Sequence, residues 1–160
     1  MKLIRARQFA VLFSKQMIEA IMAVEIPEGY KLWTDMGTDP FEDLAGPFHL
    51  KPQEDGTHKC AFISDPKHAN MGGMIHGGLL MTFADYALFA IARDCLGEAG
   101  GVTISFNSEF VSAGPIGALI EASGEIVKVT GSMVFVRGKI YTGEQTILSF
   151  SGIIKKLRSR

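Results

Sequence analysis

The chain has 160 residues, of which 47% are apolar and 21% charged, and its formal net charge is −1. This length and composition fit one packed domain and exclude a disordered tail or a strongly basic nucleic-acid-binding protein. Its two cysteines, Cys60 and Cys95, have neither a CxxC spacing nor the density of a secreted disulfide scaffold, so we expect a cytoplasmic protein.

The N-terminal segment predicts an amphipathic helix. Apolar side chains recur mostly at three- and four-residue steps between residues 3 and 23. A basic start before an apolar run is also found in signal peptides, but Ser14–Gln16 interrupts this run and no small-residue cleavage site follows. We therefore interpret residues 1–25 as a helix appended to a single domain at residues 26–160.

The next part of the chain is rich in turn-forming residues. Proline and glycine recur through residues 26–57, around a strand expected at Phe41–Leu50. A short strand is expected at His58–Asp65, followed by a polar and glycine-rich loop at Pro66–Ile75.

A buried helix is predicted from Gly77 to about Cys95. It has almost no polar face, which is typical of a helix covered on all sides, and Gly97 marks its end. Asp85 and Arg93 interrupt its apolar run, which argues against a membrane span.

Four strand-like runs follow the helix, separated by glycine or proline. They cover Val102–Val111, Ala118–Thr130, Met133–Thr142 and Gln145–Lys155. Short connections make the later strands antiparallel neighbours. A meander of long strands can hide the preceding helix only if the sheet curls around it. The expected fold is α+β, a hotdog fold in which a curved antiparallel β-sheet wraps a long central helix.

The first of these runs alternates between apolar and polar side chains. Such a period of two predicts one apolar and one polar face. The apolar set is Val102, Ile104, Phe106 and Phe110, and the polar set is Thr103, Ser105, Asn107 and Glu109.

A loop that ends in His76-Gly77-Gly78 opens the central helix. Free backbone N–H groups at a helix N-terminus can meet a developing negative charge, and glycine lets a substrate approach closely. The two glycines could also simply form a tight turn.

Asp85 lies in the middle of the apolar helix, where an ionised carboxylate is costly unless it is paired or hydrogen-bonded. One explanation is a structural hydrogen bond to a neighbouring element. The other is catalysis, because a partly desolvated carboxylate is a better base or nucleophile near neutral pH.

Other catalytic classes find little support. His68 and His76 could ligate a metal, but no third ligand stands at a typical spacing, so we expect no metal site. No serine has the surroundings of a nucleophile elbow, and the glycine-rich loop lacks the Lys-Ser/Thr of a P-loop.

The pattern Asn70-x-x-Gly73-x-x-His76-Gly77-Gly78 with Asp85 resembles the signature of the phenylacetate-pathway (PaaI-like) hotdog acyl-CoA thioesterases. The likeness continues through Gly101-Val102-Thr103, Asn107 and the Phe110–Pro115 turn. It covers about residues 41–156 and leaves the N-terminal helix as an addition.

The resemblance implies a set of catalytic roles. Asp85 would be the general base or nucleophile, and the backbone N–H of Gly77 would polarise the thioester carbonyl. Asn70 and His76 would place the thioester or the water. Thr103 would orient the water with its hydroxyl, at a position where the family often has serine.

The resemblance also places the CoA part of the substrate along the helix start and two turns, with no separate cofactor. The implied substrate-binding residues are Gly78, Phe110, Val111, Ser112, Ala113, Gly114, Pro115, Lys128, Val129, Thr130, Gly131, Ser132 and Met133.

Helix geometry adds an expectation about assembly. Gly77 and Asp85 are eight residues apart, or about 12 Å at roughly 1.5 Å per residue, so one helix cannot bring both groups to one carbon. The resemblance and this spacing together predict a homodimer with two equivalent shared sites, alone or within a tetramer.

Two alternatives stay open at this point. One is a non-catalytic protein that binds or senses acyl-CoA, since a fold does not fix a function. The other is a hotdog dehydratase acting on a 3-hydroxyacyl thioester. Such enzymes usually place a histidine five residues after an aspartate, and Ala90 holds that position after Asp85.

Overall fold

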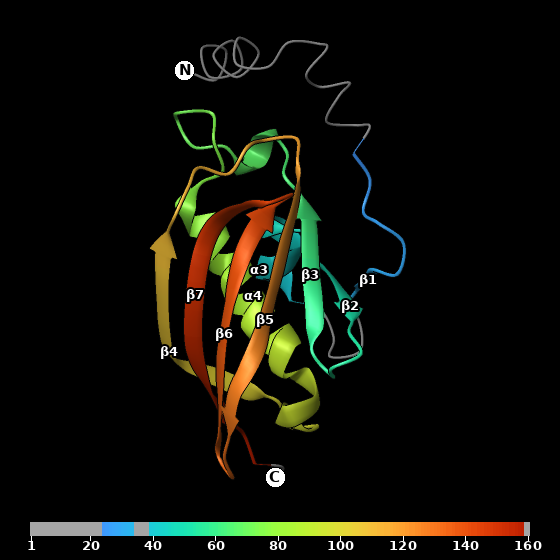
Figure 1. Ribbon diagram of the computed structural model, residues 1–160, viewed down its shortest axis with the longest axis vertical. Helices are drawn as coiled ribbons and strands as arrows, with labels where there is room; N and C mark the ends of the chain where they lie inside the picture. The colour runs from blue at the N-terminus through green and yellow to red at the C-terminus, as the bar shows by residue number, and fades with distance from the viewer. Residues whose placement is uncertain (1–23, 34–38, 159–160) are drawn as a thin grey trace.

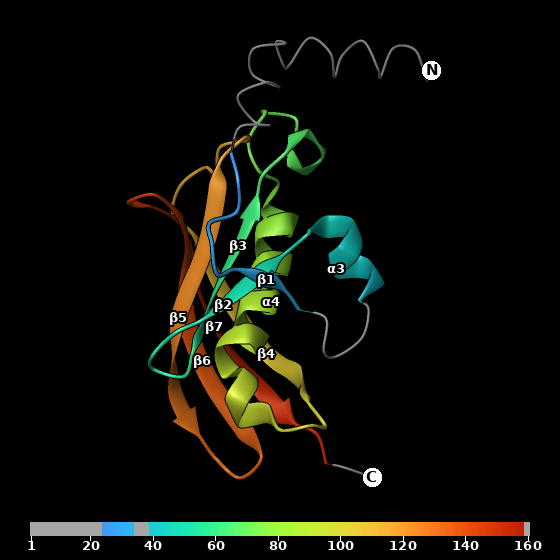
Figure 2. The same ribbon diagram turned by 90° about the vertical axis from the view of Figure 1, so that its right-hand side faces the viewer.

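The computed structural model describes residues 24–33 and 39–158. The helix expected between residues 3 and 23 lies outside this part. A seven-stranded antiparallel sheet curves along one long helix, in the order β1-β2-β3-β5-β6-β7-β4, which confirms the predicted α+β arrangement (Figures 1 and 2). The elements are β1 Lys31–Leu32, α3 Pro40–Ala45, β2 His49–Pro52, β3 His58–Ile63, a 3-10 helix Pro66–His68, α4 Gly77–Leu96, β4 Gly101–Phe110, β5 Leu119–Val129, β6 Met133–Thr142 and β7 Gln145–Lys156.

The central helix α4 supplies most of the core. Phe83, Ala84, Leu88 and Ile91 are fully buried against the inner face of the sheet. The predicted burial on all sides is only partly right, because Met81 is 43% exposed and Asp85, one turn further on, is only partly covered. The described residues therefore leave one face of α4 open. None of the described helices is long and apolar enough to cross a membrane.

Close helix–sheet contact depends on glycine in the strands. A Cβ on Gly152 of β7 would lie 2.4 Å from Cδ1 of Leu88 on α4. Gly124 and Gly138 are paired across β5 and β6, and a Cβ on Gly124 would lie 2.8 Å from Cδ1 of Ile91. Gly152 and Gly124 therefore let α4 lie closer to the sheet than a side chain at either position would permit.

The strand expected at Phe41–Leu50 is wrong over its first half, where the chain forms α3. The carboxylate of Asp39 accepts hydrogen bonds from the N–H groups of Phe41 and Glu42, and Pro40 occupies the first helical position. An Asp cap followed by Pro favours a helix start over a strand. The strand begins only at His49, and the one expected at His58–Asp65 is confirmed as β3.

Strand β4 does not continue the meander. It pairs with β7 rather than with β5, so it forms one edge of the sheet. Its predicted strict alternation is wrong, because the register shifts between Thr103 and Ser105 and leaves Ile104 as an extra residue. The bulge lets Thr103 contact α4 while Phe106 also packs against the core, and Ile104 is 51% exposed.

Candidate active site

The loop that leads into α4 is tied to the rest of the fold by His68. This buried side chain accepts a hydrogen bond at Nδ1 from the Asp65 N–H (2.9 Å), so Nε2 carries the proton and donates to the Ala45 carbonyl (2.9 Å). The His68 carbonyl accepts from the His76 N–H at 2.8 Å. Both ring nitrogens are thus used in holding the loop, and His68 is a structural residue.

His76 caps α4 with its side chain. Its Nδ1 accepts a hydrogen bond from the Gly78 N–H at 2.9 Å. This N–H is therefore already used, although the sequence predicted that Gly78 would contact the substrate. Among the described residues the Gly77 N–H has no partner, and Gly77 lines a pocket. The helix start thus offers one backbone donor, at Gly77.

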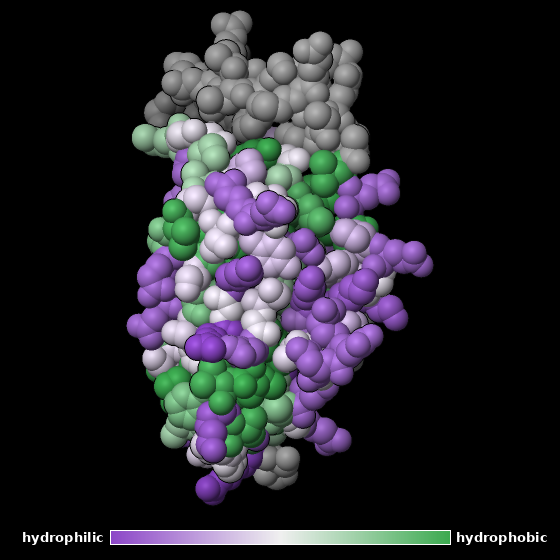
Figure 3. Space-filling view, viewed as in Figure 1, coloured by the Kyte–Doolittle hydropathy of each residue, from purple (hydrophilic) through white to green (hydrophobic). Residues whose placement is uncertain are grey.

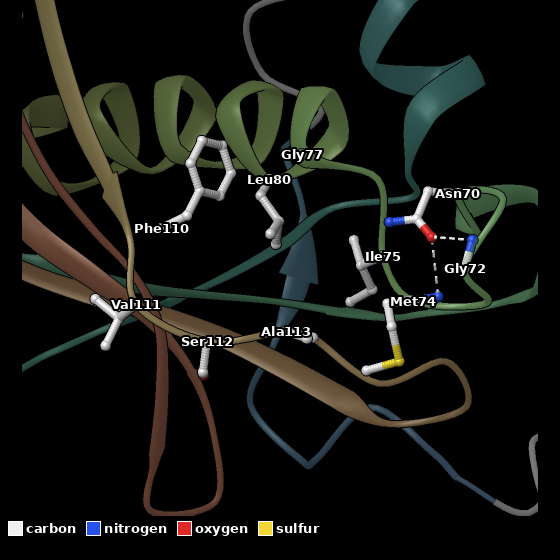
Figure 4. Close-up of a pocket in the computed structure, with 11 residues that line it drawn as sticks. Asn70, Gly72, Met74, Ile75, Gly77, Leu80, Phe110, Val111, Ser112 and Ala113 are labelled. Carbon is white, nitrogen blue, oxygen red and sulfur yellow. Dashed lines mark hydrogen bonds between the residues drawn. The ribbon is translucent and has the colours of Figure 1, made fainter.

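Asn70 shapes the loop on the other side of this pocket. Its Oδ1 accepts hydrogen bonds from the N–H groups of Gly72 (2.8 Å) and Met74 (3.3 Å) (Figure 4). These two donors identify the oxygen end of the amide. The Nδ2 end has no partner within the described chain, so it keeps both of its hydrogens available to a ligand.

The pocket at the start of α4 has a volume of about 400 Å³. The ring of Phe110 lies against the helix start, where a Cβ on Gly77 would be 3.2 Å from two of its carbons (Figure 4). The structure thus brings the predicted Phe110 turn together with Gly77 and Asn70. The lining residues are Asn70, Gly72, Met74, Ile75, Gly77, Leu80, Phe110, Val111, Ser112, Ala113 and Gly114.

Asp85 and Thr103 form a second polar group, away from this pocket. The Thr103 hydroxyl donates to Oδ1 of Asp85 at 2.7 Å. Neither residue lines the pocket, and Asp85 lies two helical turns beyond Gly77. Within one chain, the pocket beside Gly77 and the Asp85–Thr103 pair therefore lie apart, as two separate halves of the predicted site.

The second predicted CoA-binding turn, Lys128–Met133, is also remote from the pocket within one chain. The Lys156 N–H donates to the Ser132 carbonyl at 2.9 Å, which places this turn beside the C-terminal end of β7. In Figure 1 it lies at the lower end of the sheet, whereas the start of α4 lies at the upper end.

Sequence reasoning missed Glu42, a partly buried acid on α3. Desolvation, followed by the negative charges of Asp39, Asp85 and Asp43, raises the pKa of Glu42 to about 7. The Asp39-Pro40 pair is the signal that could have placed Glu42 in the first turn of a helix.

Comparison with known proteins gives matches in both sequence and structure. The family model described as "Thioesterase superfamily" matches residues 72–149. A Pseudomonas aeruginosa protein named "Putative esterase" is 30% identical over 131 residues, which cover 81% of this chain and 96% of that protein.

Two solved structures show the same likeness. A variant of the phenylacetic acid degradation protein PaaI from Thermus thermophilus is 25% identical, with a TM-score of 0.65 and coverage of 74% of this chain and 100% of that chain. A Bacillus halodurans protein crystallised with CoA is 29% identical, with a TM-score of 0.62 and coverage of 69% of this chain and 74% of that chain. These likenesses and the wrapped helix confirm the predicted hotdog fold.

Proposed function

Since the chain belongs to the thioesterase superfamily, we propose that it hydrolyses acyl-CoA thioesters to free CoA and a carboxylic acid. The observation that carries this proposal is the pair of polar groups on α4. The Asp85 carboxylate in the middle of the helix accepts a hydrogen bond from Thr103 of β4. At the start of the same helix, Gly77 lines a pocket, and its N–H has no partner among the described residues. A carboxylate and a backbone donor are the two groups that water attack on a thioester requires.

Each residue has a role in this reaction. Asp85 removes a proton from water or attacks the carbonyl carbon itself, and Thr103 fixes the direction of its carboxylate. The Gly77 N–H stabilises the oxyanion, an effect worth about 2.7 to 4 kcal/mol for one donor in other enzymes. The amide N–H of Asn70 orients the water or the thioester, and His76 holds the helix start in place.

The site is shared between two subunits in this proposal. Within the described residues, the face of α4 around Asp85 is left open and β4 has a neighbouring strand on one side only. A partner subunit would cover both surfaces. If the β4 strands of two subunits pair antiparallel with Asn107 at the centre, Thr103 of one subunit lies beside Phe110 of the other. Because Thr103 contacts Asp85 and Phe110 contacts Gly77, this register brings the two halves of the site together.

The same antiparallel register accounts for the two predicted CoA-binding turns. It brings the lower end of one subunit beside the upper end of the other, so the Lys128–Met133 turn of one approaches the Val111–Gly114 turn of its partner. Lys128 then offers a positive charge to the phosphates of CoA, and the thioester end enters the pocket beside Gly77.

A dimer of dimers has a candidate surface as well. Exposed apolar side chains lie towards the lower end of the sheet, where Figure 3 shows a hydrophobic area. Patches of this kind mark interaction sites, so a tetramer would use this face. The exposed residues are Val102, Ile104, Val127, Val129 and Leu157. The two free cysteines, Cys60 and Cys95, fit a cytoplasmic setting.

Release of CoA thiol from short, medium, long and aryl acyl-CoA esters tests the proposal. We expect turnover by the wild type and its loss in Asp85→Asn, with unchanged thermal unfolding. Asp94→Asn, an exposed carboxylate on the same helix, is the matched control and keeps turnover. Binding of acyl-CoA without hydrolysis by the wild type would instead favour an acyl-CoA-binding protein, and hydration of a 2-enoyl-CoA would favour a dehydratase.

A further inference from the structure

The turn after β4 forms one wall of the pocket beside Gly77 and is fixed to the start of β7. The N–H groups of Val111 and Ser112 both donate to the Ile147 carbonyl, at 2.8 and 3.1 Å. The Ser112 hydroxyl donates to the Thr146 carbonyl at 2.6 Å. Three hydrogen bonds to the backbone of β7 therefore hold this wall in place.

The same contacts leave Ser112 without a hydrogen to donate to a ligand. Its N–H and its hydroxyl are both already used, although the sequence predicted Ser112 to be a substrate-binding residue. Its hydroxyl oxygen also accepts a hydrogen bond from Nε2 of Gln145 at 3.0 Å. Ser112 thus holds a second side chain, that of Gln145, at the pocket wall.

Gln145 is the exposed first residue of β7. Because the Ser112 hydroxyl donates its hydrogen to Thr146, its oxygen can only accept, so the amide end that faces Ser112 is the nitrogen. Among the described residues, neither Oε1 of Gln145 nor the second hydrogen of Nε2 has a partner. The amide therefore presents one donor and one acceptor in a direction that Ser112 fixes. Such prior fixing lowers the entropy that is lost when a ligand binds.

The rest of this wall is apolar. Phe110 and Val111 are 55% and 59% exposed, and their side chains can contact alkyl groups but make no hydrogen bonds. In Figure 4, Ser112 lies past Val111 as the chain runs on from Phe110 beside the start of α4. A ligand that extends from Gly77 along this wall therefore meets apolar side chains first and the Gln145 amide afterwards. Short alkyl segments joined by amides match this order.

We propose that Gln145 binds the outer amide of the pantetheine arm of CoA, the amide farther from the sulfur. The proposal rests on the proposed function, in which the thioester lies beside Gly77 and CoA leaves along the Val111–Gly114 turn. An amide of the arm carries one N–H and one carbonyl, which pair with Oε1 and the free Nε2 hydrogen of Gln145. Only a short ethylene link separates the inner amide from the sulfur, so the inner amide stays near Gly77.

Gln145→Leu removes the amide and keeps the length of the side chain. The β6–β7 hairpin does not depend on this amide, because the two strands pair through their backbones from Thr142 and Gln145 onward. The three hydrogen bonds that hold Val111 and Ser112 also remain. Glu144→Leu is the matched control, since Glu144 is the neighbouring exposed residue of the same turn.

The KM values of three thioesters with the same acyl group test the proposal. The esters are those of CoA, of pantetheine and of N-acetylcysteamine, which keeps only the inner amide. We expect Gln145→Leu to raise KM about two- to tenfold for the first two, the range for a neutral hydrogen bond, and not for the third. Its kcat should be unchanged, and Glu144→Leu should raise none of the three KM values.

Two results overturn the proposal. One is an unchanged KM of Gln145→Leu for acyl-CoA. The other is an equal rise in KM for all three esters, which would show that Gln145 only shapes the turn.

Calorimetric titration with free CoA separates this proposal from the proposed function. Binding of CoA that is two- to tenfold weaker in Gln145→Leu than in the wild type supports the role of Gln145 even if no ester is hydrolysed. Equal CoA affinity in the two proteins overturns that role even when the wild type hydrolyses acyl-CoA. A wild type that neither hydrolyses acyl-CoA nor binds CoA overturns both.

Discussion

The Thr103 hydroxyl on β4 donates a 2.7 Å hydrogen bond to Oδ1 of Asp85 on α4. The bond joins the edge strand of the sheet to the middle of the central helix, and the bulge at Ile104 lets Thr103 make it while Phe106 also packs inward. A carboxylate held on one oxygen keeps its second oxygen for water or for a carbonyl carbon.

Thr103→Val should lower turnover by about tenfold or more, because one hydrogen bond to a charged group is worth about 1.5 to 3 kcal/mol and roughly 1.4 kcal/mol corresponds to tenfold in rate. Valine has nearly the shape of threonine but cannot donate to Asp85. Thr103→Ser is the control, because it keeps the hydroxyl and should retain most of the activity. Steady-state kcat for the three proteins checks this, and equal kcat for valine and threonine would contradict the role of Thr103.

Gly152→Ala should destabilise the fold by about 1 to 3 kcal/mol, because the new methyl would overlap the Leu88 side chain in a packed core. Gly131→Ala is the matched control, since a Cβ there meets nothing within 4 Å. Urea unfolding of both variants measures the difference. Equal unfolding midpoints would mean that α4 does not lie as close to β7 as the structure has it.

The fold should lose stability as pH falls below about 6.5, in part through His68. Burial lowers the pKa of His68, so below its unfolded value of 6.5 the unfolded chain takes up a proton that the folded chain does not. The contribution is therefore present above pH 6.5 and lost on acidification. Burial lowers the pKa of His49 in the same direction.

Denaturant unfolding at neutral and mildly acidic pH measures this loss. His68→Asn should be less stable at neutral pH. Its free energy of unfolding should also fall less on acidification than that of the wild type, because His49 is then the only described histidine whose pKa is lowered by burial. A drop of equal size in both proteins would assign the acid sensitivity to groups other than His68.

The sequence predicted those features that depend on local pattern. The central helix follows from its apolar run, and the four later strands follow from their length and the glycines between them. The loop motif also grouped Asn70 with Gly77, and both residues line one pocket, because they are close in sequence and the helix start fixes both.

Features that depend on long-range pairing were missed. The sequence of residues 101–110 does not indicate that β4 pairs with β7, and an alternating pattern of apolar and polar residues does not predict a bulge. Glu42 was missed because the Asp39-Pro40 helix start was overlooked in a segment interpreted as turns and a strand. Its proximity to Asp85 further depends on how α3 packs on α4.

Gly77→Pro should abolish most turnover. Proline is well tolerated at the first position of a helix but lacks the N–H that would meet the oxyanion. Gly77→Ala is the control for bulk, since it adds a Cβ beside Phe110 and keeps the N–H. We expect kcat of the alanine variant to lie well above that of the proline variant. Equal losses would show that Gly77 matters only because it has no side chain, and not because of its N–H.

Asp85→Asn and Gly77→Pro together test the shared site most directly. In a mixed dimer that carries one substitution in each subunit, one site loses both groups while the other keeps Asp85 from one subunit and the Gly77 N–H from its partner. Co-expression with two different tags isolates this mixed dimer, and thiol release from an acyl-CoA measures it. The shared site predicts about half of the wild-type turnover from two inactive parents. A mixed dimer as inactive as its parents would contradict it.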